Sequence, residues 1–111
     1  MHVKLKKKFG QNFLVDKNIS RKIFNLIPNN ITKIIEIGPG IGHLTDFLLK
    51  DHIRKLTLIE IDSDFLSTLN EKYKKIKYVE IINQDIMNLD LSVYDPDSII
   101  TVSYTHLTLP T

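Results

Sequence analysis

The sequence lacks several residue types that functional sites often use: its 111 residues include no cysteine, no tryptophan and only four glycines. The absence of cysteine excludes disulfide bonds, thiolate metal sites and cysteine nucleophiles. Long apolar runs are absent too, since no stretch approaches the ~20 residues of a membrane-spanning helix. The basic first residues lack the apolar stretch of a signal peptide, so we expect a cytoplasmic protein with no membrane association.

The composition that remains is typical of one globular domain, with 42% hydrophobic and 25% charged residues. Charge is divided unevenly along the chain. Residues 1–33 hold eight Lys or Arg and one acid, whereas residues 34–111 hold seven Lys or Arg and twelve acids. A basic head suits contact with nucleic-acid phosphates. The alternative for such a lysine run is a solvated tail.

Hydrophobic periodicity predicts that helices and strands alternate along the chain. The expected helices span 16–27, 44–50 and 63–73, and the expected strands span 34–37, 56–61, 78–82 and 98–102. Asp16 is the expected N-cap of the first helix, and Pro28 ends it. The alternation predicts an α/β fold with a parallel sheet and flanking helices. The pattern stops after about half of a doubly wound sheet.

Three of the four glycines, Gly38, Gly40 and Gly42, lie between the first expected strand and the next helix. Nucleotide-containing ligands bind at this position in open α/β sheets, because glycine lets backbone N–H groups approach the ligand at a helix N-terminus. The alternative is a tight strand-to-helix turn without a ligand. The dinucleotide fingerprint would place its third glycine at position 43, where this chain has His43.

Four acids lie at or after the ends of the expected strands: Glu36, Glu60, Asp62 and Asp85. Carboxylates repel a pyrophosphate but suit a cationic ligand with free ribose hydroxyls, so we expect S-adenosyl-L-methionine as the cofactor. Glu60 can accept from both ribose hydroxyls, and Asp85 can accept from the adenine amino group. We expect Asp62 to cap a helix. Glu36 is left with two interpretations, orienting the turn or contacting the methionyl end.

Four segments together resemble the ribosomal RNA adenine N6-dimethyltransferase family. They are residues 8–16 (KFGQNFLVD), 36–45 (EIGPGIGHLT), 59–62 (IEID) and 84–85 (QD). The glycine segment alone would fit any class I methyltransferase, whereas the first segment is far more specific. The variants present are more similar to the bacterial small-subunit enzymes than to the macrolide-resistance enzymes that act on the large subunit.

The resemblance implies a class I, Rossmann-like methyltransferase domain whose N-terminal half is present here. It implies an N-terminal arm over residues 1–15, a partial methyltransferase domain over 16–101, and a ribosomal RNA substrate in the small subunit. It also implies a protein that is monomeric at full length and needs no metal. The cofactor-binding residues that it implies are Gln11, Asn12, Leu14, Gly38, Gly40, Glu60, Ile61, Asp85 and Ile86.

The family places an Asn-Leu-Pro-Tyr type motif after the fourth strand, and this chain departs from it. Leu109 and Pro110 match the centre of the motif, but Thr108 stands in place of the Asn and Thr111 in place of the aromatic residue. The resemblance implies that, in the family, the Asn side chain of this motif accepts hydrogen bonds from the adenine N6 hydrogens and that the aromatic ring stacks on the base. We therefore assign no catalytic residue and expect no methyl transfer by the 111-residue chain.

We interpret the last ten residues, 102–111, as not belonging to the natural sequence. Residues 98–111 carry no Asp, Glu, Lys or Arg, and residues 102–111 match a reading frame through a transposon-end adapter used to prepare sequencing libraries. We therefore expect the natural sequence to end at about residue 101 and the last ten residues to be a non-native tail. The fourth strand would then lack its outer neighbour and leave an apolar edge open to pairing.

The same residues allow three alternative functions to be compared with this one. A large-subunit dimethylase of the macrolide-resistance type is one alternative, which only the missing C-terminal half would distinguish securely. A module that binds the cofactor or RNA without catalysis would lack the Asn-Leu-Pro-Tyr type motif in its natural sequence. An NAD-dependent enzyme is disfavoured by the glycine spacing and the acidic strand ends.

Overall fold

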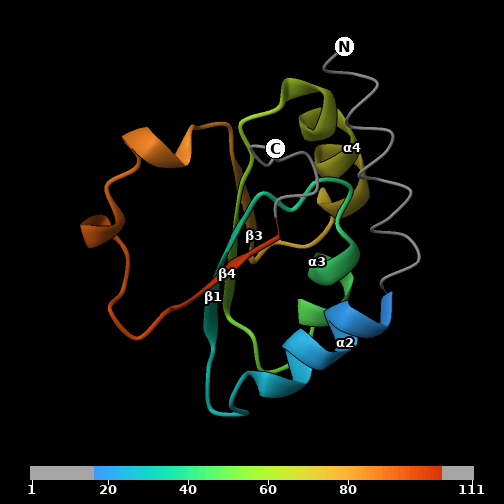
Figure 1. Ribbon diagram of the computed structural model, residues 1–111, viewed down its shortest axis with the longest axis vertical. Coiled ribbons are helices and arrows are strands. Elements are labelled where there is room, and N and C mark those ends of the chain that lie inside the picture. Colours follow the sequence, from blue (N-terminus) through green and yellow to red (C-terminus); the bar gives the residue numbers. More distant parts are fainter. Residues whose placement is uncertain (1–16, 104–111) are drawn as a thin grey trace, which may run out of the picture.

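A computed structural model describes residues 17–103 of the chain, and its elements alternate between helix and strand (Figure 1). In chain order they are α2 (Lys17–Leu26), β1 (Lys33–Ile37), α3 (His43–Leu48), β2 (Lys55–Ile59), α4 (Ser63–Tyr73), β3 (Val79–Ile82), the 3-10 helices η1 (Ile86–Asn88) and η2 (Leu91–Val93), and β4 (Ile99–Val102). No helix in this described part is long and apolar enough to cross a membrane.

The four strands form one parallel sheet in the order β3-β2-β1-β4. Strand β1 lies inside the sheet, where Ile37 pairs with Ile59 of β2 on one side and with Val102 of β4 on the other. Because all strands run the same way, their carboxyl ends meet at one edge of the sheet. The predicted α/β class with a parallel sheet and flanking helices is confirmed.

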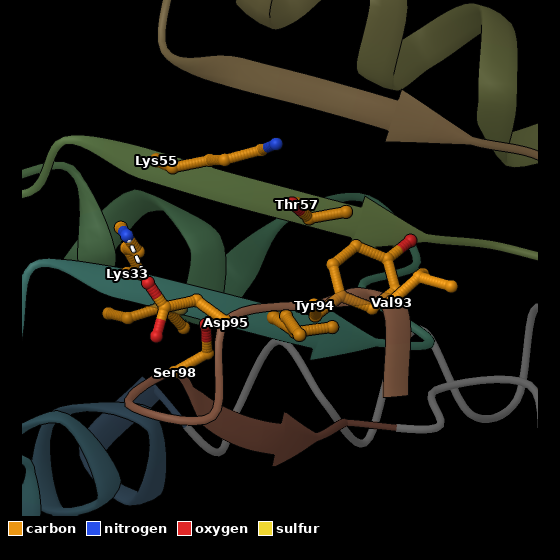
Figure 2. A pocket seen from close by; sticks show the side chains of 9 residues that line it. Lys33, Lys55, Thr57, Val93, Tyr94, Asp95 and Ser98 are labelled. Atoms are coloured by element: carbon orange, nitrogen blue, oxygen red, sulfur yellow. Dashed lines mark hydrogen bonds and ion pairs between the residues drawn. The ribbon is translucent and has the colours of Figure 1, made fainter. Parts of the chain in front are cut away.

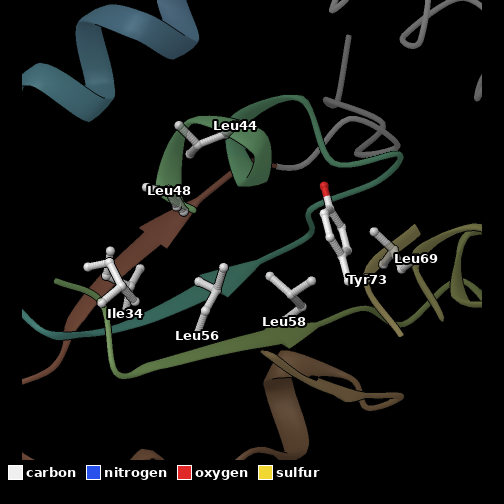
Figure 3. Packing of buried hydrophobic residues seen from close by; sticks show 8 residues of the cluster. Ile34, Leu44, Leu48, Leu56, Leu58, Leu69 and Tyr73 are labelled. Carbon is white, nitrogen blue, oxygen red and sulfur yellow. The ribbon is translucent and has the colours of Figure 1, made fainter. Parts of the chain in front are cut away.

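The main core lies between the sheet and the three helices α2, α3 and α4, which cover the same face (Figures 1 and 3). Alternate strand residues point to this face. The buried residues of this core are Ile34, Leu44, Leu48, Ile53, Leu56, Leu58, Leu69 and Tyr73. This packing fixes the start of α3 and the end of α4 against the carboxyl ends of β1 and β2.

The opposite face of the sheet is covered by the segment between β3 and β4, which carries the two 3-10 helices (Figure 1). Ile35, Ile37 and Ile59 are buried there, and Ile86 and Tyr94 pack against them. At the amino end of β1, Lys33 forms an ion pair with Asp95 beside a cavity of about 130 Å³ that Tyr94 also lines (Figure 2). This cavity lies at the end of the strands away from the glycine turn.

The element boundaries depart from the sequence-based predictions in a few places. Helix α3 ends two residues early, because Leu49 leaves the helical region at φ −80°, ψ 82°. Strand β2 ends at Ile59 rather than residue 61, and the carboxylate of the next residue, Glu60, accepts backbone N–H groups. The periodicity did not predict η1 and η2, because three-residue helices are too short to show a period.

Two residues of the predicted non-native tail lie within the described part of the chain. Val102 is the last residue of β4, and the Ser103 N–H donates to the Ile37 carbonyl oxygen at 2.8 Å. The boundary at residue 101 stays a prediction. The N-terminal arm over residues 1–15 and the N-cap Asp16 lie outside the described residues.

Candidate functional site

The candidate site lies at the edge where the parallel strands end. Strand β1 runs into the glycine turn, β2 runs into Glu60, and β3 runs into residues 83–85. Ligands of open α/β sheets bind outside this edge, because the loops leave it and the following helix N-termini face it. The topology thus brings together three of the segments that the sequence analysis selected.

The glycine turn, defined here as residues 38–42, has a backbone that only glycine adopts easily. The φ angles of Gly38, Gly40 and Gly42 are 71°, 61° and 93°, in the left-handed region that side chains with a Cβ disfavour. The Gly38 N–H donates to Ile59 O at 2.9 Å, which ties the turn to β2. The turn leads directly into α3, because Asp46 N–H donates to Gly42 O at 3.0 Å.

Glu60 connects the glycine turn to the end of β2. Its side chain is fully buried. Oε1 accepts from the Gly40 N–H at 2.9 Å, and Oε2 accepts from the Asp62 N–H at 3.0 Å. The carboxylate of Glu60 thus holds the backbone of the glycine turn and of the segment after β2. The prediction that Glu60 binds the ribose stays a prediction. The sequence analysis did not predict that Glu60 also fixes the backbone of the turn.

The adenine side of the predicted site is built from the ends of β2 and β3. Ile61 is 50% exposed at this edge, and Ile86 lies on η1. Asp85 is the N-cap of η1, where its Oδ1 accepts from Met87 N–H at 2.9 Å. Its other carboxylate oxygen remains for a ligand donor. The contacts of Ile61, Asp85 and Ile86 with a cofactor stay predictions.

Asn83 belongs to the same edge, and the sequence analysis missed it. Its Nδ2 donates to the carbonyl oxygens of Glu60 at 2.8 Å and Ile61 at 3.2 Å. The amide therefore fixes the backbone of two residues that are expected to hold the cofactor. A lone Asn after a strand is common in turns, so the sequence carried no signal for this contact.

Glu36, for which two roles were left open, is held inside the protein. Thr45 Oγ1 donates to its Oε1 at 2.5 Å and Ser103 Oγ donates to its Oε2 at 2.7 Å. Burial raises the pKa of Glu36 to about 7, against the lowering effect of these two hydrogen bonds, and the charges of Asp46 and Glu60 raise it further. These contacts favour the role of orienting the turn and the start of α3.

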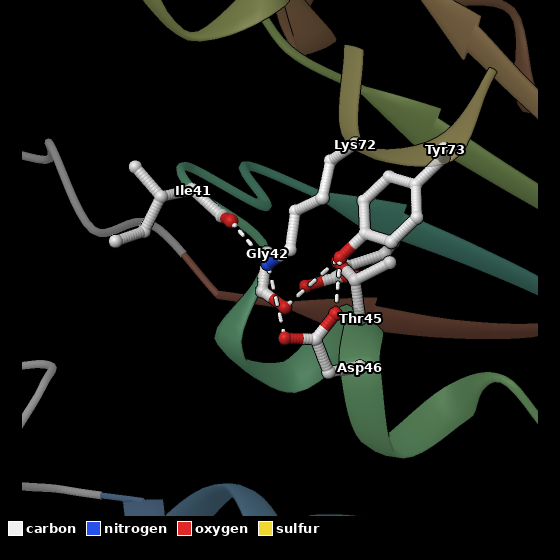
Figure 4. Close-up of polar contacts among 7 residues, drawn as sticks. Ile41, Gly42, Thr45, Asp46, Lys72 and Tyr73 are labelled. Atoms are coloured by element: carbon white, nitrogen blue, oxygen red, sulfur yellow. Dashed lines mark hydrogen bonds and ion pairs between the residues drawn. The ribbon is translucent and has the colours of Figure 1, made fainter. Parts of the chain in front are cut away.

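A second group of polar contacts fixes the glycine turn from α4 (Figure 4). Tyr73 and Lys72, the last two residues of α4, reach across to the turn and to Asp46 of α3. Burial, followed by the hydrogen bond to Asp46, raises the pKa of the Tyr73 hydroxyl above its ordinary value. The sequence analysis assigned neither residue a role in the site.

Three predicted cofactor residues, Gln11, Asn12 and Leu14, lie outside the described residues. Within residues 17–103, no group of His, Asp and Glu side chains is arranged to hold a metal ion. The polar groups at the strand ends are carboxylates, which accept hydrogen bonds, and backbone N–H groups, which donate them. This set fits a cationic nucleoside with free hydroxyls, as S-adenosylmethionine is, and it disfavours a pyrophosphate.

Comparison with known proteins finds sequence relatives among ribosomal RNA methyltransferases. The family model described as ribosomal RNA adenine dimethylase matches residues 2–104. Ribosomal RNA small subunit methyltransferase A of Campylobacter fetus is 44% identical over 90 residues, covering 78% of this chain and 33% of that protein. The protein of the same name from a Hydrogenobaculum species is 43% identical over 93 residues, covering 83% of this chain and 36% of its own length.

Solved structures share the fold. The 23S rRNA methyltransferase ErmE superposes with a TM-score of 0.55 at 31% identity, over 67% of this chain and 30% of that one. The glycopeptide N-methyltransferase MtfA, solved with S-adenosyl-L-methionine, superposes with a TM-score of 0.57 at 15% identity, over 68% of this chain and 35% of that one. The chain thus spans about a third of the length of the curated relatives it matches.

Proposed function

The chain belongs to the ribosomal RNA adenine dimethylase family, and on that premise we propose that its protein uses S-adenosylmethionine to dimethylate N6 of adenosines in small-subunit ribosomal RNA. The relatives named small subunit methyltransferase A support the choice of substrate, because they are 43–44% identical over most of this chain. The 111 residues supply the cofactor-binding half of that activity. A ribosomal substrate also favours a cytoplasmic location.

The observation that carries the proposal is the joining of the glycine turn to Glu60. The hydrogen bond from Gly40 N–H to Glu60 Oε1 places a bare backbone and a buried carboxylate side by side at the strand ends. A bare backbone allows close approach of the methionyl part, and a carboxylate accepts from ribose hydroxyls. Asp85 and the apolar Ile61 and Ile86 would receive the adenine.

The chain's own residues bind and orient rather than transfer protons. The cofactor, when bound, supplies an electrophilic methyl group on its sulfonium. The acidic strand ends favour this positive charge, and the turn fixes the direction in which the methyl group points. Because the chain contains no Asn-Leu-Pro-Tyr type motif, we propose that the 111-residue chain binds cofactor without methylating RNA.

Cofactor binding is tested by titrating the chain with S-adenosylhomocysteine and, separately, with NADH, using calorimetry. We expect saturable binding of S-adenosylhomocysteine and none of NADH. Glu60→Gln keeps the size of the side chain but removes its charge, and it should weaken binding about tenfold, the loss of a charge-assisted hydrogen bond. Glu80→Gln on the exposed side of β3 is the matched control. Binding of NADH with equal affinity would contradict the proposal.

The choice between ribosomal subunits needs the natural gene. Reading the source locus past codon 101 from a transposon-free library should give an Asn-Leu/Ile-Pro-Tyr/Phe motif within a few codons. The protein from that complete gene should methylate unmodified small subunits and leave large subunits unmodified. Methylation of large subunits instead would favour the activity named for the 31% identical 23S rRNA methyltransferase.

A further inference from the structure

The end of α4 contacts the glycine turn, although α4 contributes none of the residues that are expected to bind the cofactor. We propose that Tyr73 and Lys72 are positioning residues that lock the glycine turn in its cofactor-binding shape. The inference deepens the proposed function and rests on it for the identity of the ligand. We call the side chains of Tyr73, Lys72 and Asp46 the α4 clamp.

The buried half of the clamp is the Tyr73 hydroxyl. Its proton has a short acceptor in Asp46 Oδ1 at 2.6 Å, and Gly42 O lies 3.2 Å from the same hydroxyl oxygen. The raised pKa of Tyr73 keeps this hydroxyl protonated, and therefore a donor, at every physiological pH. A residue 31 positions away in sequence thus contacts the last residue of the turn and the first turn of α3.

The exposed half of the clamp is the Lys72 ammonium. Its Nζ donates to Ile41 O at 2.9 Å and to Asp46 Oδ2 at 3.0 Å (Figure 4). The two oxygens of the Asp46 carboxylate are therefore divided between Tyr73 and Lys72. Lys72 and Tyr73 therefore contact the consecutive carbonyls of Ile41 and Gly42 at the end of the turn, and both also contact Asp46 at the start of α3.

The glycine turn needs such an external hold. Its three glycines have no side chains to pack, and glycine loses more conformational freedom on ordering than any other residue. If the turn were loose, cofactor binding would have to order it and would lose affinity. The clamp fixes the turn before the cofactor binds. Tyr73 lies so close to residue 42 that only glycine fits there. A Cβ on Gly42 would lie 2.3 Å from the Tyr73 hydroxyl oxygen.

Tyr73→Phe tests the buried half, because the ring stays in the core while the hydroxyl is lost. Tyr78→Phe is the matched control, since Tyr78 packs against the same core away from the turn. The readouts are amide hydrogen exchange of Gly40, Gly42 and Asp46 without ligand, and the Kd for S-adenosylhomocysteine. We expect exchange to quicken and the Kd to rise about fivefold to tenfold for Tyr73→Phe only, the loss of one hydrogen bond in a network.

Lys72→Ala tests the exposed half and should raise the Kd about threefold, less than Tyr73→Phe because solvent screens the contact. Lys74→Ala is its control, since Lys74 donates to Glu71 on the same helix and does not reach the turn. Lys72→Arg should restore the affinity, because a guanidinium also donates to two acceptors. A merely structural role would change the melting temperature without this rescue of the Kd.

The outcomes separate the clamp from the proposed function. Unchanged amide exchange in Tyr73→Phe overturns the clamp whether or not ligand binds. Quicker exchange with an unchanged Kd overturns its role in positioning the cofactor. Quicker exchange in a chain that binds no S-adenosylhomocysteine, even unsubstituted, supports the lock on the turn and overturns the proposed cofactor function.

Discussion

At the scale of single residues, the site contains two buried carboxyl groups that accept hydrogen bonds from different kinds of donor. Glu60 accepts two backbone N–H groups and fixes the geometry of the turn. Glu36 accepts from two hydroxyls that lie in different segments of the chain. Burial of Glu36 has a thermodynamic consequence, because its pKa rises from 4.5 to about 7 in the folded protein.

Glu36 should therefore make stability fall as pH rises. Between pH 4.5 and about 7 the folded protein keeps a proton on Glu36 that the unfolded chain releases, so the free energy of unfolding decreases through this window and levels off above it. The decrease is on the order of 3 kcal/mol. Glu36→Gln cannot titrate and should remove most of this slope. Urea unfolding of both proteins at pH 5 and pH 8 measures it, and equal slopes would contradict the prediction.

Gly42→Ala should destabilise the protein for two reasons that can be separated. The φ of 93° disfavours any Cβ, and the added Cβ meets the Tyr73 hydroxyl oxygen at 2.3 Å. We expect a loss of about 2–4 kcal/mol from strain and overlap together. Tyr73→Phe removes this hydroxyl oxygen, although Lys72 Nζ at 3.1 Å and the ring carbon Cζ at 3.2 Å stay close to the added Cβ, so Gly42→Ala should cost less in that background. A double-mutant cycle by urea unfolding measures the difference, and strict additivity would show that the overlap has no effect.

At the scale of elements, α4 does more than cover the core. Its first residue follows the cap Asp62, whose side chain accepts from Asp64 N–H at 2.9 Å, as the sequence analysis predicted. Its last residues form the α4 clamp. The helix thus connects the segment after Glu60 to the glycine turn.

Loss of the helix cap should weaken this element. Asp62→Ala removes the acceptor for the Asp64 N–H and should lower the free energy of unfolding by ~1 kcal/mol. Asp62→Asn keeps an acceptor oxygen and should lower it by a few tenths at most. Urea unfolding compares the three proteins. An equal loss in both variants would mean that the negative charge of Asp62, rather than its hydrogen bond, stabilises α4.

At the scale of the whole molecule, the two faces and two edges of the sheet differ in how they are covered. Three helices cover one face, and a segment with two 3-10 helices covers the other (Figure 1). In the described residues β4 is an edge strand, and Ile100 and Val102 on it are 45% and 52% exposed. The expectation that the fourth strand leaves an apolar edge open to pairing stays a prediction.

An apolar edge strand of this kind should make the 111-residue chain associate with itself. Ile100→Lys places a charge on the edge and should lower the sedimentation coefficient to that of a monomer at concentrations where the unsubstituted chain associates. Met87→Lys changes an equally apolar and more exposed residue on η1, away from the edge. Sedimentation velocity compares the three. Equal association of the unsubstituted chain and Ile100→Lys would exclude β4 as the contact.

Sequence alone determined the features that depend on residues near one another in the chain. Apolar runs predicted the strands and helical spacing predicted the helices. This works because the spacing of buried residues in an element can be read from consecutive residues. Helix α4 has the predicted bounds, 63–73. The glycine spacing likewise located the turn, and Asp62 was identified as a cap from its place before a helix.

Only the tertiary structure decided which distant residues meet. Tyr73 lies 31 positions from Gly42, and Asn83 lies 23 positions from Glu60. A tyrosine at the end of a helix and an asparagine after a strand have many uses, so neither carries a local signal. Their roles follow from the parallel sheet, which brings the ends of β1, β2 and β3 to one edge and sets α4 against the turn. Local pattern thus selected the residues that are predicted to face the ligand, and packing decided which other residues contact them.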